Sequence, residues 1–175
     1  MKRTAKVFGA AALGLALLAT TVQAQSSTPV TWNVGVGLSM PSTSGFNTGF
    51  HARFGANIPL ESAPVWIRPE VGLDHLGVSC AGCGGLTLFD MGADVGYTFK
   101  TTTEVGWYIL GGLQVTNHSF SESVYRYSTS FTRLGMNLGG GMTFPLANHV
   151  GYLELRFVST GGNFEMWPLT FGLRF

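Results

Sequence analysis

The feature that most constrains this chain is an alternation of apolar residues with glycine or charged residues, repeated in one segment after another. A clear example sets Phe89, Met91, Ala93, Val95 and Tyr97 against Asp90, Gly92, Asp94 and Gly96. A period of two predicts β-strands with one wide apolar face and one small or polar face. In water the apolar face would need a second sheet to cover it, whereas in a bilayer lipid covers it.

The alternation predicts eight strands, at residues 31–40, 45–60, 65–78, 86–100, 105–116, 129–146, 150–158 and 164–175. A strand that crosses a bilayer needs about 9 to 11 residues, and nearly all of these segments supply them. The connections at 61–64, 101–104 and 147–149 are short, whereas 117–128 is long and polar; short periplasmic turns and longer outer loops are typical of outer-membrane barrels. The predicted fold class is therefore all-β, an eight-stranded antiparallel up-and-down transmembrane β-barrel.

Ten charged residues of these strands fall on the glycine-rich face. A register slip of one residue would turn all of them toward lipid, where each Arg costs about 2–4 kcal/mol near the midplane. An eight-stranded barrel is just wide enough to be filled by side chains, and the inward glycines make room for the charges. We therefore predict a lumen closed by an ion-pair network, without assigning partners, of Arg53, Arg68, Glu70, Asp74, Asp90, Asp94, Arg133, Glu154, Arg156 and Arg174.

Two prolines fit the strand pattern poorly. Pro69 and Pro168 lie inside predicted strands of a closed sheet, which offers no free edge to a residue without an N–H. We expect a bulge or a strand end at each of them.

A soluble alternative is a lipocalin-like barrel or a β-sandwich in the periplasm. Such a protein would place apolar residues inside and Lys, Glu and Asp on its outer surface. This chain has 45% hydrophobic and only 11% charged residues, and its charges lie among the glycines. The composition therefore favours the membrane protein.

The first residues predict a secretory signal peptide at 1–24, followed by one barrel domain at 25–175. Lys2, Arg3 and Lys6 precede an apolar run that is too short to span a membrane as a helix, and Val22-Gln23-Ala24 offers small residues for cleavage. Of the ten Lys and Arg residues three leave with the signal, while all nine Asp and Glu residues remain, so the net charge of the mature chain is −2. With no basic patch left, nucleic acid is not an expected partner.

Cys80 and Cys83 lie in the expected connection between the third and fourth strands. In an oxidising compartment the pair predicts a local disulfide that pins a glycine-rich tip. A redox site would require a strand-to-helix setting, which this segment lacks, and a metal site would require two more ligands, of which His75 is the only near candidate. We expect neither a metal nor a cofactor.

One enzyme hypothesis remains open. His118, Ser119 and nearby Glu122 are residue types found in acyl-transfer sites, but they fall in the expected loop, where such residues are common. The His-x-Ser-Asn motif of outer-membrane lipid A deacylases has no counterpart in residues 155–160, which contain no His. We therefore expect a protein that is not an enzyme, with an outer-membrane lipid hydrolase as the less favoured alternative.

The last strand carries apolar residues at every second position and ends at Phe175. Phe171, Leu173 and Phe175 resemble the C-terminal insertion signal of Gram-negative outer-membrane β-barrels. Over residues 30–175 the chain resembles the small eight-stranded barrels of the OmpA-domain and OmpX kind, in the outer membrane protein beta-barrel domain family.

This resemblance implies a monomer in the bacterial outer membrane that contacts membrane lipid and the barrel insertion machinery. It also implies a salt-bridged lumen with little permeability and a structural or interaction role, in envelope integrity or adhesion, through extracellular loops. The candidate loop contacts for an unknown external ligand are Phe120, Tyr125, Arg126 and Tyr127. The main alternative is a narrow pore or small-solute conduit.

Overall fold

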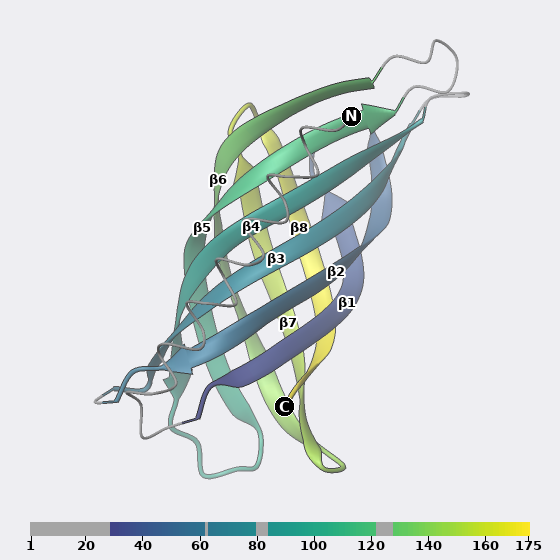
Figure 1. Ribbon diagram of the computed structural model, residues 1–175. Coiled ribbons are helices and arrows are strands. Elements are labelled where there is room, and N and C mark those ends of the chain that lie inside the picture. The colour runs from purple at the N-terminus through teal and green to yellow at the C-terminus, as the bar shows by residue number, and fades with distance from the viewer. Residues whose placement is uncertain (1–28, 62, 80–83, 122–127) are drawn as a thin grey trace.

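The computed structural model describes residues 29–61, 63–79, 84–121 and 128–175 (Figure 1). Within these ranges the chain forms eight strands: β1 Thr31–Pro41, β2 Phe46–Pro59, β3 Val65–Val78, β4 Gly85–Phe99, β5 Gly106–Ser121, β6 Ser128–Leu146, β7 His149–Thr160 and β8 Phe164–Arg174. Every strand pairs antiparallel with its neighbours and β8 pairs back onto β1, which confirms the predicted closed up-and-down barrel. None of the described residues belongs to a helix long and apolar enough to cross a membrane.

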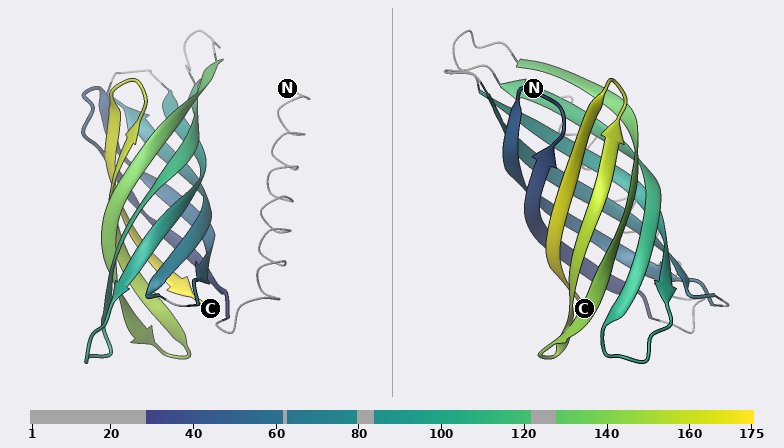
Figure 2. Two further views of the ribbon diagram at one scale, coloured as in Figure 1. Left: turned by 90° about the vertical axis from the view of Figure 1, so that its left-hand side faces the viewer. Right: turned by 180° about the vertical axis from the view of Figure 1, so that it is seen from behind.

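The barrel closes where its first and last strands meet. Beyond the end of β8, Phe175 accepts a backbone hydrogen bond from Trp32 at 2.8 Å and donates one to the Trp32 carbonyl at 3.0 Å. Closure of this kind pairs backbone groups that hydrocarbon could not solvate. We call this end, where β1 begins and β8 ends, the terminal end of the barrel, and the opposite end the far end (Figure 2).

The two faces of the sheet differ as the alternation predicts. Side chains that point outward are apolar and exposed, with exposed fractions of 72% for Phe50 and 68% for Leu138. The inward side chains include charged groups that are almost completely buried, such as Arg68 and Asp74 at 0%. Because successive side chains of a strand point to opposite faces, this division fixes the register of every strand.

The lumen contains three layers of different chemistry. The far end holds an apolar cluster of Leu76, Leu86, Leu88, Val158, Phe164 and Met166. The middle holds the charged groups described below, and the terminal end holds a second cluster of Trp66, Tyr108 and Leu110. The apolar far layer was not predicted from the sequence, although its residues continue the inward parity of the charged ones.

Strand bounds agree closely with the prediction except in β5. The strand β3 has the predicted bounds, but β5 continues to Ser121, and its residues 117–121 pair with residues 128–132 of β6. The long polar loop predicted at 117–128 is therefore mostly strand. The predicted contrast in connection length is also wrong, because the far-end connections 42–45 and 161–163 are as short as 60–64 and 100–105 at the terminal end.

Neither proline makes the bulge or strand end that was expected. Pro69 pairs with Ala93 of β4, and Pro168 pairs with Ser39 of β1, each well inside its strand. On the other side of each proline the ladder is interrupted and then resumes in the same register. Among the described pairs of β2 and β3, the register shifts instead between Asn47 and Phe50. A missing N–H thus costs a local hydrogen bond without displacing the strand.

A glycine under an indole ring provides a test of lumen packing. Gly96 pairs directly with Trp66, and a methyl group added at Gly96 would overlap the Trp66 ring, which is 7% exposed. We predict that Gly96→Ala destabilises the barrel by about 1–3 kcal/mol, the usual cost of overpacking. The measurement is the urea dependence of the compact, heat-modifiable band on a denaturing gel.

The matched control for this variant is Gly111→Ala. Gly111 has outward parity, and a methyl group there would lie 3.4 Å from its nearest neighbours, an ordinary contact. Its unfolding curve should match that of the unmutated protein. Equal curves for Gly96→Ala and Gly111→Ala would contradict the tight packing of Trp66 on β4.

Candidate functional site

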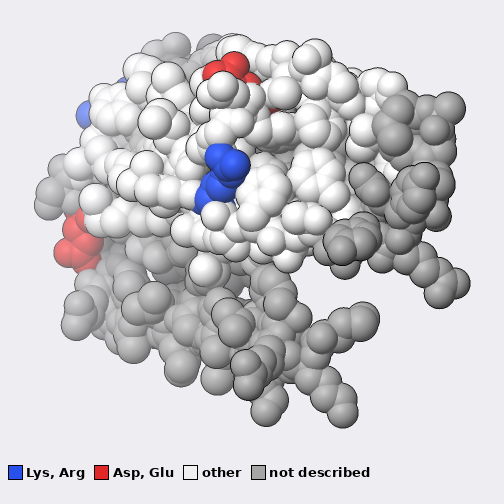
Figure 3. Space-filling model, turned by 90° about the horizontal axis from the view of Figure 1, so that it is seen from above, with Lys and Arg blue, Asp and Glu red and all other residues white. Residues whose placement is uncertain are grey.

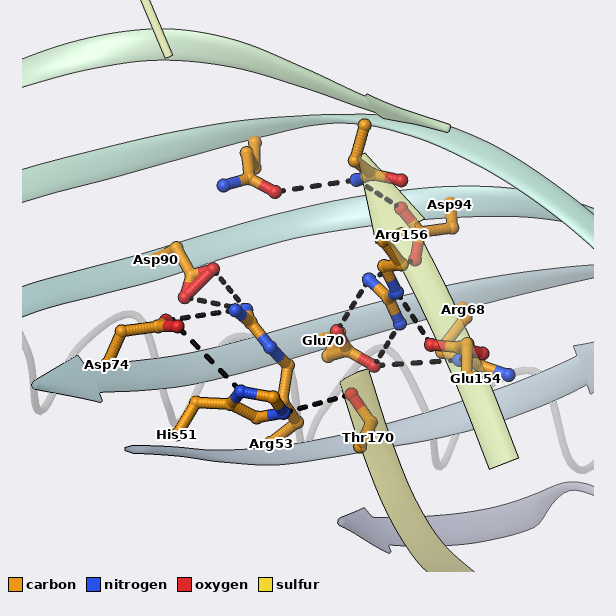
Figure 4. Close-up of polar contacts among 12 residues, drawn as sticks. His51, Arg53, Arg68, Glu70, Asp74, Asp90, Asp94, Glu154, Arg156 and Thr170 are labelled. Atoms are coloured by element: carbon orange, nitrogen blue, oxygen red, sulfur yellow. Dashed lines mark hydrogen bonds and ion pairs between the residues drawn. The ribbon is translucent and has the colours of Figure 1, made fainter. Parts of the chain in front are cut away.

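The charged middle layer of the lumen divides into two groups of ion pairs (Figure 4). In the group nearer the far end, Arg53 of β2 contacts two carboxylates. Its Nη2 lies 2.9 Å from Oδ2 of Asp74, and its Nη1 donates to both oxygens of Asp90, with 2.8 Å to Oδ2. One guanidinium therefore holds two acids from β3 and β4.

The second group is centred on Arg156 of β7. Arg156 contacts Glu70 of β3 at 2.9 Å, Asp94 of β4 at 3.0 Å and Glu154 of its own strand at 2.6 Å. Arg68 adds a second cation, with its Nη1 2.8 Å from Glu154 and 3.7 Å from Glu70. These contacts cross the lumen from one wall to the other, since β3 and β7 are not neighbours in the sheet.

Neutral side chains complete the network. Tyr108 donates to Glu154 at 2.7 Å, Asn137 donates to Asp94 at 2.8 Å, and Arg68 Nε donates to Asn57 at 2.8 Å. The cavity between the two groups has a volume of about 10 Å³, which is room for about one water molecule. At this level the lumen is filled by side chains rather than open.

Eight of the ten residues predicted for the lumen network lie in these two groups, whereas Arg133 and Arg174 do not. Arg133 is exposed at the far end, where its Nη1 donates to the Gly161 carbonyl at 2.7 Å and its guanidinium lies 4.9 Å from the Phe131 ring centre. It has the inward parity of the network residues, but it lies above the charged layer. The alternation predicts which face of the sheet a residue lies on, but it does not predict the position of that residue along the barrel axis.

Arg174 lies at the terminal end, inside an aromatic cage. Its guanidinium carbon is 4.9 Å from the ring centre of Tyr108, 5.4 Å from that of Tyr152 and 5.9 Å from that of Trp66. No carboxylate of the described residues lies within ion-pair distance of it. Cation–π contacts therefore replace the ion pair that was predicted.

A polar cluster beside Arg53 joins Asp74 to three residues that were not singled out from the sequence, Ser39, His51 and Thr170. Ser39 donates to Asp74 and lies 2.9 Å from His51 Nδ1, while His51 Nε2 lies 2.9 Å from the Thr170 hydroxyl. These four side chains are 0–4% exposed. Their shared inward parity with Arg53 was visible in the sequence, but their proximity depends on pairing of β1 with β2 and β8.

The residues of the enzyme hypothesis point to opposite faces. His118 is buried in the lumen, where its ring stacks on Phe131 with centroids 4.8 Å apart, whereas the adjacent Ser119 has outward parity and donates to Asn117. They form no nucleophile and base pair. Within the described ranges, no group of three or more His, Cys, Asp or Glu residues could hold a metal ion.

The predicted loop contacts also need correction. Phe120 lies in β5 with inward parity and packs against the apolar far layer and Phe46, so it is not an external loop contact. Tyr125, Arg126 and Tyr127 lie outside the described residues, as do Cys80, Cys83 and the predicted signal peptide.

At the far end, the described part of β6 has an open edge. Pairing of β6 with β7 begins at Gly135 and Thr160, and the Gly161 N–H then donates to the Leu134 carbonyl at 3.0 Å. Residues 128–133 of β6 pair with β5 on one side and with no described strand on the other. In Figure 1 this part of β6 extends beyond the tips of β7 and β8. Its unpaired backbone groups are available to another chain.

An apolar outer wall around a polar, ion-paired lumen defines the class of transmembrane β-barrels. Residues 10–175 match the family described as outer membrane protein beta-barrel domain, and the chain belongs to this family. The protein is accordingly placed in the bacterial outer membrane. Among curated proteins, no sequence matches the chain.

Several solved structures share the fold. Neisserial surface protein A has a TM-score of 0.66 and 19% identity, over 83% of this chain and 95% of that chain. The attachment invasion locus protein Ail of Yersinia pestis has a TM-score of 0.57 and 17% identity, over 83% and 97% of the two chains. A major outer membrane protein of Thermus thermophilus has a TM-score of 0.55 and 14% identity, over 85% and 100%. At these identities the likeness shows the fold alone.

The Arg156 group predicts a large loss of stability when its central cation is removed. Arg156→Ala would leave Glu70 and Asp94, 6% and 2% exposed, without this partner. Breaking a buried pair by removing one member typically costs about 3–5 kcal/mol. Denaturant unfolding of the refolded barrel in lipid vesicles should therefore shift to much lower urea. Arg133→Ala is the control, because an exposed contact contributes about 0–1 kcal/mol; a similar shift for both variants would contradict the assignment.

Proposed function

We propose that this protein is a non-enzymatic anchor in the outer membrane, with a lumen sealed by charge pairs, that presents its β5–β6 hairpin to an extracellular protein partner. The observation that carries the proposal is the open edge of β6 at residues 128–133. The far end faces outward in this proposal, because a chain secreted to the periplasm inserts from there and leaves both of its ends behind.

The sealed lumen supports an anchor rather than a pore. Two ion-pair groups, of which the Arg156 group crosses the lumen, fill the middle, and the apolar far layer lies above them with six side chains that are 0–7% exposed. A solute would have to displace both layers. Within the described part of the chain, both layers therefore argue against the alternative of a narrow pore.

The geometry of β6 suggests how a partner would bind. Since the Leu134 carbonyl faces the β7 side, Thr132 and Ser130, two and four residues away, direct their N–H and C=O groups to that same open side. An extended peptide could add to this edge as a further strand, with main-chain hydrogen bonds providing affinity. We propose an extended segment of an extracellular protein as the partner.

A sulfated polysaccharide is a less suitable partner for this chain. Ail of Yersinia pestis has been crystallised with the heparin analogue sucrose octasulfate, at a TM-score of 0.54 and 18% identity to this chain. Binding of a polysulfate requires several cations. Among the described residues at the far end, Arg133 is the one Lys or Arg side chain, and Figure 3 shows a surface with few charged groups.

Three expectations from the sequence accompany this proposal and stay predictions. They are the insertion signal of Phe171, Leu173 and Phe175, the barrel insertion machinery that it would contact, and the monomeric state. Outward exposure of Phe171 and Phe175, at 47% and 56%, leaves both rings accessible to such a partner.

The sealed lumen predicts an absence of conductance. The refolded, unmutated barrel should give no steady ion-conducting openings in a planar bilayer. The double variant Glu70→Ala with Arg156→Ala removes a pair that lines the small central cavity, and it should also stay closed, because the apolar far layer remains in place above that cavity. Steady openings of the unmutated protein would favour the pore over the anchor.

The open edge predicts an effect of proline on adhesion. Thr132→Pro removes an N–H that faces the open side, which a strand edge tolerates, and should block strand addition. Thr132→Ala is the matched control, because it also loses the hydrogen bond from Asn117 to the Thr132 hydroxyl but keeps the N–H. Bacteria that display the unmutated barrel or Thr132→Ala should adhere to epithelial monolayers, and bacteria with Thr132→Pro should lose most of this adhesion at equal surface levels. Adhesion no greater than that of cells without the barrel would refute the interaction role.

A further inference from the structure

The aromatic cage at the terminal end of the lumen leaves the N–H groups of its cation without acceptors. Arg174 is the last residue of β8 and is half-buried. Its Nε and Nη2 atoms are buried, and no described residue accepts a hydrogen bond from either of them. The rings of Tyr108, Tyr152 and Trp66 attract the positive charge of the guanidinium, but they provide no acceptor oxygen in its plane.

The two nitrogen atoms without acceptors are the pair that suits an oxyanion. The Nε–H and one Nη2–H of a guanidinium lie side by side in one plane and point in the same direction, so they match two oxygen atoms of a carboxylate or a phosphate. A water molecule could accept from these groups, but it brings no negative charge. A chloride ion brings the charge, but it offers one acceptor atom where the guanidinium offers two parallel donors.

The charges around Arg174 also favour an anion. Arg68 and Arg174 both lie over the Trp66 ring, with their guanidinium carbons 4.6 Å and 5.9 Å from its centre. The carboxylate of Glu154, which accepts from Arg68 at 2.8 Å, accepts from Arg156 as well, at 2.6 Å. This carboxylate is therefore already shared between two cations. The described carboxylates leave the charge of Arg174 without a direct counterion.

Asn33 adds a second polar group beside this guanidinium. It is the direct partner of Arg174 in the pairing of β1 with β8, and its side chain is 0% exposed. Within the described part of the chain, neither Nδ2 nor Oδ1 of Asn33 has a hydrogen-bond partner. Side chains that are directly opposed in an antiparallel pair begin about 4.5–5.5 Å apart. An amide has one donor end and one acceptor end, so Asn33 suits an anion that also carries a hydroxyl group.

We propose that Arg174 and Asn33 form a binding site for one inorganic phosphate ion, which enters from the aqueous side at the terminal end. Two phosphate oxygens accept from Nε and Nη2 of Arg174. The Asn33 amide donates to the phosphate and accepts from the P–OH group that inorganic phosphate keeps at neutral pH. A carboxylate and the phosphodiester of a phospholipid both lack this hydroxyl group, so they suit the site less well. The site goes beyond the proposed function and does not depend on the partner of β6.

The test measures anion binding by isothermal titration of the folded barrel, refolded in a detergent that contains no phosphorus. Inorganic phosphate should bind as one ion per barrel. Acetate and chloride, titrated at the same pH and ionic strength, should each bind about tenfold more weakly or less, because each loses at least one hydrogen bond to a charged group. Refolding from denaturant keeps the measurement independent of the insertion machinery.

Two variants separate the roles of the two residues. Arg174→Lys keeps the charge but loses the parallel donors, so the affinity for phosphate should fall about tenfold. Asn33→Leu removes both ends of the amide and should lower the affinity for phosphate to that for acetate. Arg133→Lys is the matched control, because Arg133 is an arginine at the opposite end of the barrel whose Nη1 already donates to the Gly161 carbonyl. It should bind phosphate as the unmutated protein does.

Four outcomes would overturn the proposal. These are no phosphate binding to the unmutated protein, which would leave water alone at the donors, equal affinities for phosphate and chloride, equal losses in Arg174→Lys and Arg133→Lys, and displacement of phosphate by a short-chain phosphatidylglycerol, which would assign the site to a lipid head group. The folded fraction of each variant is checked by heat-modifiability, and Asn33→Ala replaces Asn33→Leu if the latter does not fold. Conductance and adhesion are separate measurements, so failure here leaves the proposed function unaffected and the converse also holds.

Discussion

The cost of placing charge in hydrocarbon governs this structure. Charged side chains on the strands must point inward, and once inside they must find partners, because a lone buried charge is more costly than a paired one. Arg53 with Asp74 and Asp90, and Arg156 with Glu70, Asp94 and Glu154, meet both demands. Since each of these residues faces inward in only one of two registers, the same charges that fill the lumen also fix how the strands pair.

This constraint explains how much of the fold could be predicted. Within the membrane, lipid outside and a narrow lumen inside require apolar and small or polar residues to alternate along each strand. This is why β3 was predicted with its observed bounds. Beyond that band the outward residues need not be apolar. Asn117 and Ser119 are outward polar residues that still pair with Thr132 and Ser130, so β5 continues where its sequence pattern stops. The loop prediction failed because backbone pairing persists after the hydrophobic reason for alternation has ended.

The limits of the site prediction have a related cause. Alternation assigns a face to each residue, but the height of a residue in the barrel depends on strand stagger, which no local pattern reveals. Arg53 and Arg133 share inward parity, yet one lies in the charged layer and the other is exposed at the far end beside Gly161. Likewise, Arg156 and Glu70 are separated by 86 residues and meet across the lumen only after the barrel has closed.

The division of the lumen into layers makes the barrel wall a rigid base for its two ends. The ion-paired middle ties opposite walls together, the apolar far layer packs above it, and the aromatic cage of Arg174 lines the terminal end. Because these contacts hold the strands from within, the described part of β6 can extend past β7. The barrel therefore holds the open edge of β6 in one position. A strand edge that is already ordered loses less conformational entropy when another strand binds to it.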